Sequence, residues 1–151
     1  MTEIFAGMNK QEKIAILALA VTCSGIAYLM WQLFFATGVL ASGTMPEGVR
    51  DNVAKLFAVL ILGFMLIRNF GSGPLEDERD RQVKAKGMEA GYFALVLQLV
   101  VTGVAVGSDA YASYIGSRSS AWLEMYLLLC IAVSVAANYA VKAFHYWRDR
   151  R

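Results

Sequence analysis

The sequence predicts an all-α fold: a four-helix bundle that spans a membrane as one domain, residues 1–151, with both termini in the cytoplasm. Composition is the first reason, because 58% hydrophobic and 17% charged residues with a mean hydropathy of +0.49 are too apolar for an ordinary soluble domain. Length is the second, because a helix needs about 20 apolar residues to cross about 30 Å of hydrocarbon. Four blocks have about that length: residues 14–36, 53–70, 88–106 and 121–141.

The first block, residues 14–36, is expected to be a retained membrane anchor and not a cleaved signal peptide. Its apolar run continues past Cys23 to Ala36, which is longer than the apolar core of a signal peptide. Asn9 is followed three residues later by Glu12, and this capping-box spacing predicts where the helix begins.

The second block, residues 53–70, is interrupted by two cations but is still expected to span the membrane. Lys55 and Arg68 lie near its ends, where long side chains reach the headgroups while their stems stay in the apolar layer. Glycines and Pro74 then end the helix. After two crossings the chain is back on the side of its N-terminus.

A dense charged stretch, "PLEDERDRQVKAKG", precedes the third block. Acids come first and bases later, which suits a helix dipole, and Asp77–Arg81 and Asp80–Lys84 have the favourable i to i+4 spacing. We expect residues 75–87 to be a helical extension that projects about two to three turns into the cytoplasm. A solvated extension that only sets topology leaves the four acids unexplained, whereas a docking surface uses them. The candidate partner-binding residues are Glu76, Asp77, Glu78, Arg79, Asp80, Arg81, Lys84 and Lys86.

Small and hydrogen-bonding residues form a stripe along the third block, residues 88–106, when they are counted in steps of three and four. Its ends carry two GxxxG pairs, which let a neighbouring backbone approach closely. The stripe predicts helix packing, either within one chain or between copies in a homo-oligomer. The candidate packing residues are Gly87, Gly91, Gln98, Thr102, Gly103 and Gly107.

Polar residues also mark the last block, residues 121–141. Glu124, Ser134 and Asn138 are a candidate polar site inside the membrane, because unsatisfied polar groups in hydrocarbon cost several kcal/mol and are expected to face protein or water. Glu124 is then a titratable site for protons or a cationic amphiphile. The alternative places Glu124 at the outer interface, where the helix N-terminal dipole stabilises it.

Lysine and arginine residues set the predicted orientation. Of the 14 in the chain, only Arg50, Lys55 and Arg118 lie in or next to the two outer connections. The other 11 lie beside the N-terminus, the charged stretch and the C-terminus. By the positive-inside rule these three regions are cytoplasmic, as in a prokaryotic cytoplasmic membrane protein.

The chain lacks the residues of common catalytic and metal sites. It has one histidine, His145, and two isolated cysteines, Cys23 and Cys130, and it contains no HExxH, phosphate-loop or nucleophile-elbow motif. We therefore expect no metal, no cofactor and no enzymatic activity. Direct nucleic-acid binding is not expected either, because the net charge is only +2. The basic C-terminal "RDRR" is expected to meet anionic lipid.

The charged stretch resembles a known family. Asp77, Glu78 and Arg79, followed by Val83 and a Lys/Ala-rich step into a membrane helix, are similar to the Asp-Glu-Arg motif of small predicted prokaryotic membrane proteins grouped as a domain of unknown function. The resemblance covers residues 53–106 and the four-span layout, and Val83 stands where the family often has Ile. It implies a membrane partner for a small helix-turn-helix regulator, and it implies no reaction.

Two functional hypotheses follow. In the first, a non-enzymatic membrane protein uses residues 76–86 to bind a cytosolic regulator or another membrane subunit through salt-sensitive contacts. In the alternative, a small transporter or amphiphile-binding protein uses Gln98, Glu124 and Asn138. The alternative requires a continuous cavity that joins these three side chains.

Overall fold

The computed structural model describes Met8 and residues 10–36, 48–70 and 78–149, and every regular element in these ranges is a helix. The all-α prediction is therefore confirmed for this part of the chain. Asn9, the predicted cap of the first helix, lies outside the described residues. The elements are α2 (Lys10–Met30), η1 (Trp31–Phe35), α4 (Val49–Phe70), α5 (Glu78–Val106), α6 (Asp109–Gly116) and α7 (Ser120–Arg148).

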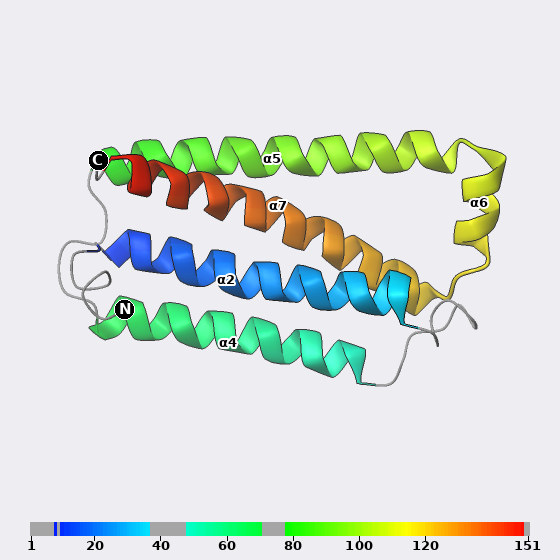
Figure 1. Ribbon diagram of the computed structural model, residues 1–151, viewed down its shortest axis with the longest axis horizontal. Coiled ribbons are helices and arrows are strands. Elements are labelled where there is room, and N and C mark those ends of the chain that lie inside the picture. Colours follow the sequence, from blue (N-terminus) through cyan, green and yellow to red (C-terminus); the bar gives the residue numbers. More distant parts are fainter. Residues whose placement is uncertain (1–7, 9, 37–47, 71–77, 150–151) are drawn as a thin grey trace.

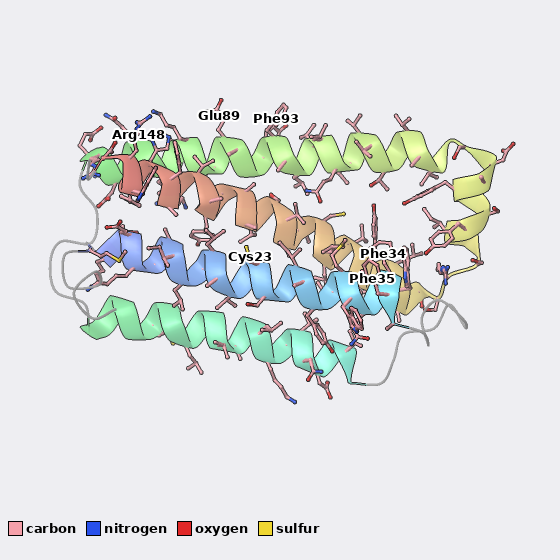
Figure 2. All side chains as sticks on the ribbon, viewed as in Figure 1. Cys23, Phe34, Phe35, Glu89, Phe93 and Arg148 are labelled. Atoms are coloured by element: carbon pink, nitrogen blue, oxygen red, sulfur yellow. The ribbon has the colours of Figure 1, made fainter. Side chains whose placement is uncertain are left out.

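Three of these helices are long and apolar enough to cross a membrane: Lys10–Phe35, Glu78–Val106 and Ser120–Arg148. Their large apolar side chains are mostly on the surface, and on α5 Val104 is 74% and Phe93 68% exposed. Figure 2 shows Phe93 pointing away from the neighbouring α7. An apolar surface of this extent is a liability in water and is what a lipid environment requires.

The described helices differ from the predicted blocks mainly in length. From Glu78 onward, the charged stretch and the third block form one continuous helix, α5, and the last block continues as α7 to Arg148. The connection at residues 107–120 contains the short helix α6, which the sequence analysis did not anticipate. Residues 53–70 belong to α4, on which Lys55 is exposed; the Arg68 side chain lies outside the described residues.

The long helices lie side by side in an antiparallel row (Figure 1). Helix α7 packs between α5 and α2, and α4 packs on the other side of α2. Helices α2 and α5 start at the end of the row where α4 and α7 finish, which is the end we call the charged end. At the opposite end, which we call the α6 end, α6 joins α5 to α7 (Figure 1).

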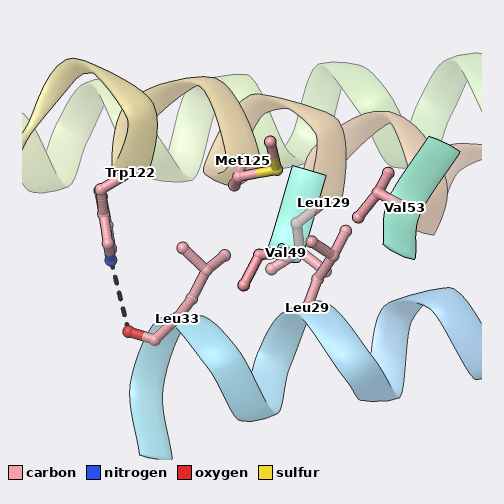
Figure 3. Packing of buried hydrophobic residues seen from close by; sticks show 7 residues of the cluster. All are labelled: Leu29, Leu33, Val49, Val53, Trp122, Met125 and Leu129. Atoms are coloured by element: carbon pink, nitrogen blue, oxygen red, sulfur yellow. Dashed lines mark hydrogen bonds between the residues drawn. The ribbon is translucent and has the colours of Figure 1, made fainter. Parts of the chain in front are cut away.

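The main hydrophobic core lies near the α6 end and is centred on Trp122, which is 1% exposed. Its indole stacks on Tyr126 with ring centroids 5.4 Å apart. Figure 3 shows the buried residues of this cluster, contributed by α2, η1, α4 and α7: Leu29, Leu33, Val49, Val53, Trp122, Met125 and Leu129.

A hydrogen bond fixes how the first membrane helix ends against this core. The last carbonyl groups of a helix have no partner within it, and η1 ends the helix that begins with α2. Trp122 Nε1 donates to the Leu33 carbonyl oxygen at 3.3 Å (Figure 3). The indole therefore fills the core with its ring and satisfies a buried backbone acceptor with its N–H.

Candidate functional site at the charged end

The first turns of α5 do not stand free in solvent, because one side of them packs against α7 and α2. Asp80 is only 6% exposed, and its Oδ1 accepts a hydrogen bond from Tyr146 Oη on α7 at 2.8 Å. One turn further on, Val83 is buried in a small cluster with Ala15 of α2 and Tyr146. A buried carboxylate needs a donor of this kind, since an unsatisfied one is costly.

Arg79 ties the start of α5 to the end of α7. Its Nε lies 3.2 Å from Asp149 Oδ2, where the N–H donates to the carboxylate. Its guanidinium carbon lies 5.8 Å from the centre of the Tyr146 ring. Arg148 also lies 3.5 Å from the Asp149 carboxylate. Each exposed pair contributes little by itself, but together with Tyr146 they hold the two helix ends in one arrangement.

The opposite side of this segment presents charge outward. Glu78 and Arg81 form a loose pair with 3.8 Å between Oε2 and Nη1, and their side chains are 77% and 70% exposed. Lys86 is exposed as well, and Lys84 is exposed but lies at the edge of this side, where it also lines a pocket between α5, α2 and α7. The segment therefore has an anchored face and a charged, solvent-facing one.

The predicted partner-binding residues thus have different positions. Asp80 is anchored inside the protein and Arg79 is engaged with Asp149, so neither is freely presented. The other described residues of the set are on the surface: Glu78, Arg81, Lys84 and Lys86. Glu76 and Asp77 lie outside the described residues, and with them the predicted Asp77–Arg81 pair.

The sequence analysis missed the partner of Asp80, although a signal for it was present. Asp80 and Val83 precede Gly87 and Gly91 at intervals of three and four residues, so they extend the small-residue stripe toward the helix start. Counting them as part of that stripe would have placed Asp80 on the packed side. Tyr146 as its donor could not be read from sequence, because the register between α5 and α7 is a tertiary property.

Close packing between α5 and α7 continues at Gly87 and Gly91. An added Cβ at Gly87 would lie 2.6 Å from Asn138 Oδ1, and one at Gly91 would lie 3.1 Å from the Ser134 carbonyl oxygen. Ser134 Oγ donates to the Gly91 carbonyl oxygen at 2.7 Å. Asn138 Oδ1 is buried and has no hydrogen-bond partner in the described part of the protein.

The remaining predicted packing residues lie toward the α6 end. Gln98 Nε2 donates to its own helix, at the Ala94 carbonyl oxygen (3.0 Å), and the Thr102 hydroxyl lies 2.9 Å from Tyr126 Oη on α7. Gly103 has open space where a Cβ would be, and at Gly107 a Cβ would meet only carbonyls of α5 itself. The second GxxxG pair therefore has no helix packed on it among the described residues.

The structure does not bring the predicted intramembrane polar residues into one site. Glu124 is exposed near the start of α7, whereas Asn138 faces α5. The 14 residues between them correspond to about 21 Å along a helix. Three pockets open between described residues, and none of these three is lined by Gln98, Glu124 or Asn138.

The described residues also form no metal-binding site. No group of three or more His, Cys, Asp and Glu side chains is close enough to hold a metal ion in the part of the chain that the structure describes. His145 Nδ1 lies 3.2 Å from Arg148 Nη2. The thiol of Cys23 is exposed and that of Cys130 is buried, and both are free.

Comparisons with protein-family models, with curated proteins and with solved structures give no match to this chain. The resemblance to the Asp-Glu-Arg family therefore stays a prediction, and a function has to be argued from the geometry of the molecule itself.

Proposed function

We propose that this chain is a non-enzymatic, four-span protein of the prokaryotic cytoplasmic membrane, and that the charged end of α5 docks a protein partner in the cytosol. The observation that carries the proposal is the two-sided first segment of α5. Asp80 and Val83 anchor it, and Glu78 and Arg81 project from it.

Rigid anchoring distinguishes a docking surface from a solvated helix extension. A surface that is already ordered loses less conformational entropy when a partner binds. The Tyr146–Asp80 hydrogen bond and the Arg79–Asp149 pair supply that order. A segment that only sets topology needs neither contact.

The charge pattern indicates the kind of partner. On the exposed side one acid, Glu78, is followed by the bases Arg81 and Lys86. A partner that places a basic group opposite Glu78 and acidic groups opposite the two bases would be favoured over other proteins, and its binding would weaken with salt. The family resemblance implies a small helix-turn-helix regulator, and another membrane subunit fits the same chemistry.

The proposed topology places this surface in the cytosol. Both cation-rich helix starts, at α2 and α5, lie at the same end of the molecule as the cation-rich end of α7 (Figure 1). The positive-inside rule assigns that end to the cytoplasm. In this topology α4 is the fourth membrane-spanning helix.

Charge reversal tests the docking proposal. The double variant Arg81→Glu/Lys86→Glu changes exposed side chains and leaves the Asp80 and Arg79 contacts intact. We expect it to abolish recovery of the species that co-purifies with the wild type in mild detergent. The control Lys13→Glu changes one charge at the same end on α2, outside the docking surface, and should leave recovery unchanged.

Salt supplies a second readout in the same experiment. Recovery with the wild type should fall between about 0.1 M and about 0.5 M salt, because exposed charge pairs are screened over that range. Equal recovery with the wild type and the double variant at low salt would refute the docking proposal.

The transport alternative is not carried further. It needs Gln98, Glu124 and Asn138 on one cavity, and no observation in the described part of the molecule favours that arrangement.

A further inference from the structure

A polar pocket lies at the charged end, between α2, α5 and α7, next to the docking surface but inside the helix row. Its volume is about 200 Å³, against roughly 10–15 Å³ on the same kind of measure for a single water. The lining combines an amide and two apolar residues of α2 with charged and hydroxyl groups of the other two helices: Gln11, Ile14, Ala15, Asp80, Lys84, Tyr139, Lys142 and Tyr146.

Lys142 is the unusual residue of this pocket. It is only partly exposed, and it forms no ion pair with any residue in the described ranges. Its Nζ lies 4.6 Å from the centre of the Tyr139 ring, and its stem covers Gly87. The ring provides only a weak counterpart for a partly desolvated ammonium.

The other charged groups of the pocket leave an excess of positive charge. Lys84 lines the same space from α5, so two ammonium groups face it. Asp80 is the one carboxylate in the lining, so the ammonium groups outnumber the carboxylates there. Gln11 adds an amide donor from α2. Two cations, an amide and the Tyr139 hydroxyl around a small space are suited to an oxyanion.

We propose that this pocket binds a phosphate group, with Lys142 and Lys84 as its cations. Lys142 directly follows the last apolar block of the chain, residues 121–141, which is the depth at which phospholipid headgroups lie in the proposed topology. Basic pockets between membrane helices on the cytoplasmic side bind anionic headgroups in this way. A headgroup phosphate is therefore the expected source, and free inorganic phosphate is the other source of the same chemistry.

Lipid titration of the full chain in detergent tests the proposal. Native mass spectrometry would count bound phosphatidylglycerol and, separately, phosphatidylcholine on the wild type and on Lys142→Met, which keeps the apolar stem and removes the charge. We expect the wild type to prefer phosphatidylglycerol, and Lys142→Met to bind it about tenfold more weakly, the usual effect of losing a charged hydrogen bond. Lys13→Met, at the same end but outside the pocket lining, is the matched control and should bind like the wild type.

A parallel arm separates the two phosphate sources. Inorganic phosphate is added at constant ionic strength, and the thermal midpoint is recorded for the same three proteins. In one outcome the thermal midpoint rises with phosphate only when Lys142 is present, while the wild type shows no preference for phosphatidylglycerol. That result supports the pocket and assigns it to soluble phosphate. Preference for phosphatidylglycerol that requires Lys142 supports the pocket and assigns it to lipid.

The proposal is overturned if Lys142→Met loses no more phosphatidylglycerol or phosphate binding than Lys13→Met does. If Lys142→Met does not fold, Lys84→Gln gives the same test from the other wall of the pocket, with the same roughly tenfold loss expected. Unchanged binding in Lys84→Gln would then overturn the proposal.

Discussion

The two GxxxG pairs of α5 have the same spacing but opposite surroundings. Gly87 and Gly91, at the charged end, lie directly against Asn138, Lys142 and Ser134 of α7. Gly103 and Gly107, at the α6 end, meet no other described helix within 4 Å of an added Cβ. Small residues therefore permit close approach without causing it.

Polar groups on α7 account for the difference between the two ends. Apolar burial does little to drive helices together in lipid, so packing and interhelical hydrogen bonds decide where they meet. The charged end has the Tyr146–Asp80 bond and the Ser134–Gly91 bond. The α6 end has only the contact between the Thr102 and Tyr126 hydroxyls among the described pairs of α5 and α7. The helices diverge there (Figure 1).

Gly91→Leu is expected to lower the free energy of unfolding more than any other substitution considered. The new side chain would overlap Asn138 Cβ and the Ser134 carbonyl oxygen, each 3.1 Å from the added Cβ, and a backbone oxygen cannot move aside as a flexible side chain can. We expect a loss of about 2–3 kcal/mol in the free energy of unfolding, as for other overpacked sites. Unfolding by sodium dodecyl sulfate in mixed micelles measures it.

Gly103→Leu is the matched control, because its side chain enters open space. Its free energy of unfolding should not fall below that of the wild type, because nothing described opposes the side chain and leucine is a better helix former than glycine. Equal losses at the two positions would mean that the contrast between the two ends of α5 is wrong.

The next effect concerns the buried hydrogen bond at the charged end. Tyr146→Phe removes the donor to Asp80 Oδ1 and leaves a buried carboxylate oxygen without it. We expect a loss of about 2 kcal/mol, the size of a hydrogen bond to a charged group, measured by the same titration. Tyr92→Phe, at a tyrosine that is 71% exposed, should change the unfolding free energy very little. A Tyr146→Phe protein as stable as the Tyr92→Phe protein would show that Asp80 does not depend on this donor.

The helical fold was predictable because it depends on local properties. Block length and hydropathy predict where α5 and α7 run, and these helices contain the third and fourth predicted blocks. The charged start of α5 was expected from its order of charges, whereas the last block ended at residue 141 because a hydropathy criterion excludes the charged residues through which α7 continues. Helix α6 was missed because its eight residues, the last of which is Gly116, carry too weak a periodic signal.

The candidate site was only partly predictable, because its geometry depends on which helices meet. The charged stretch was found from composition, but the division into an anchored Asp80 and an outward Arg81 requires the α5–α7 register. The same holds for the polar pocket, in which Lys84 and Lys142 are 58 residues apart in sequence. Glu124, Ser134 and Asn138 share a helix, yet only the structure separates Glu124 from the other two.

Gly103→Ala is expected to raise the free energy of unfolding, by less than Gly91→Leu lowers it. Glycine in a helix costs about 0.5–1 kcal/mol relative to alanine, and nothing opposes the added methyl group at this position. We therefore expect Gly103→Ala to raise the free energy of unfolding by that amount, whereas Gly91→Ala should lower it because the Ser134 carbonyl oxygen is in the way. A loss of stability in Gly103→Ala, together with loss of a dimer in sedimentation, would instead place a second copy of the chain on this glycine.

The smallest effect on the unfolding free energy is expected at the hydrogen bond that joins α5 to α7 at the α6 end. Thr102→Val keeps the shape of the side chain and removes the hydroxyl that lies 2.9 Å from Tyr126 Oη. Hydrogen bonds between membrane helices contribute about 0.6 kcal/mol on average, so we expect a loss of about that size or less. Thr102→Ser keeps the hydroxyl and should retain most of the stability. A loss of more than about 2 kcal/mol, well above that average, would mean that a single contact holds the α6 end of α5 in place. The absence of neighbours at Gly103 argues against this, because an end held that firmly would be packed as the charged end is.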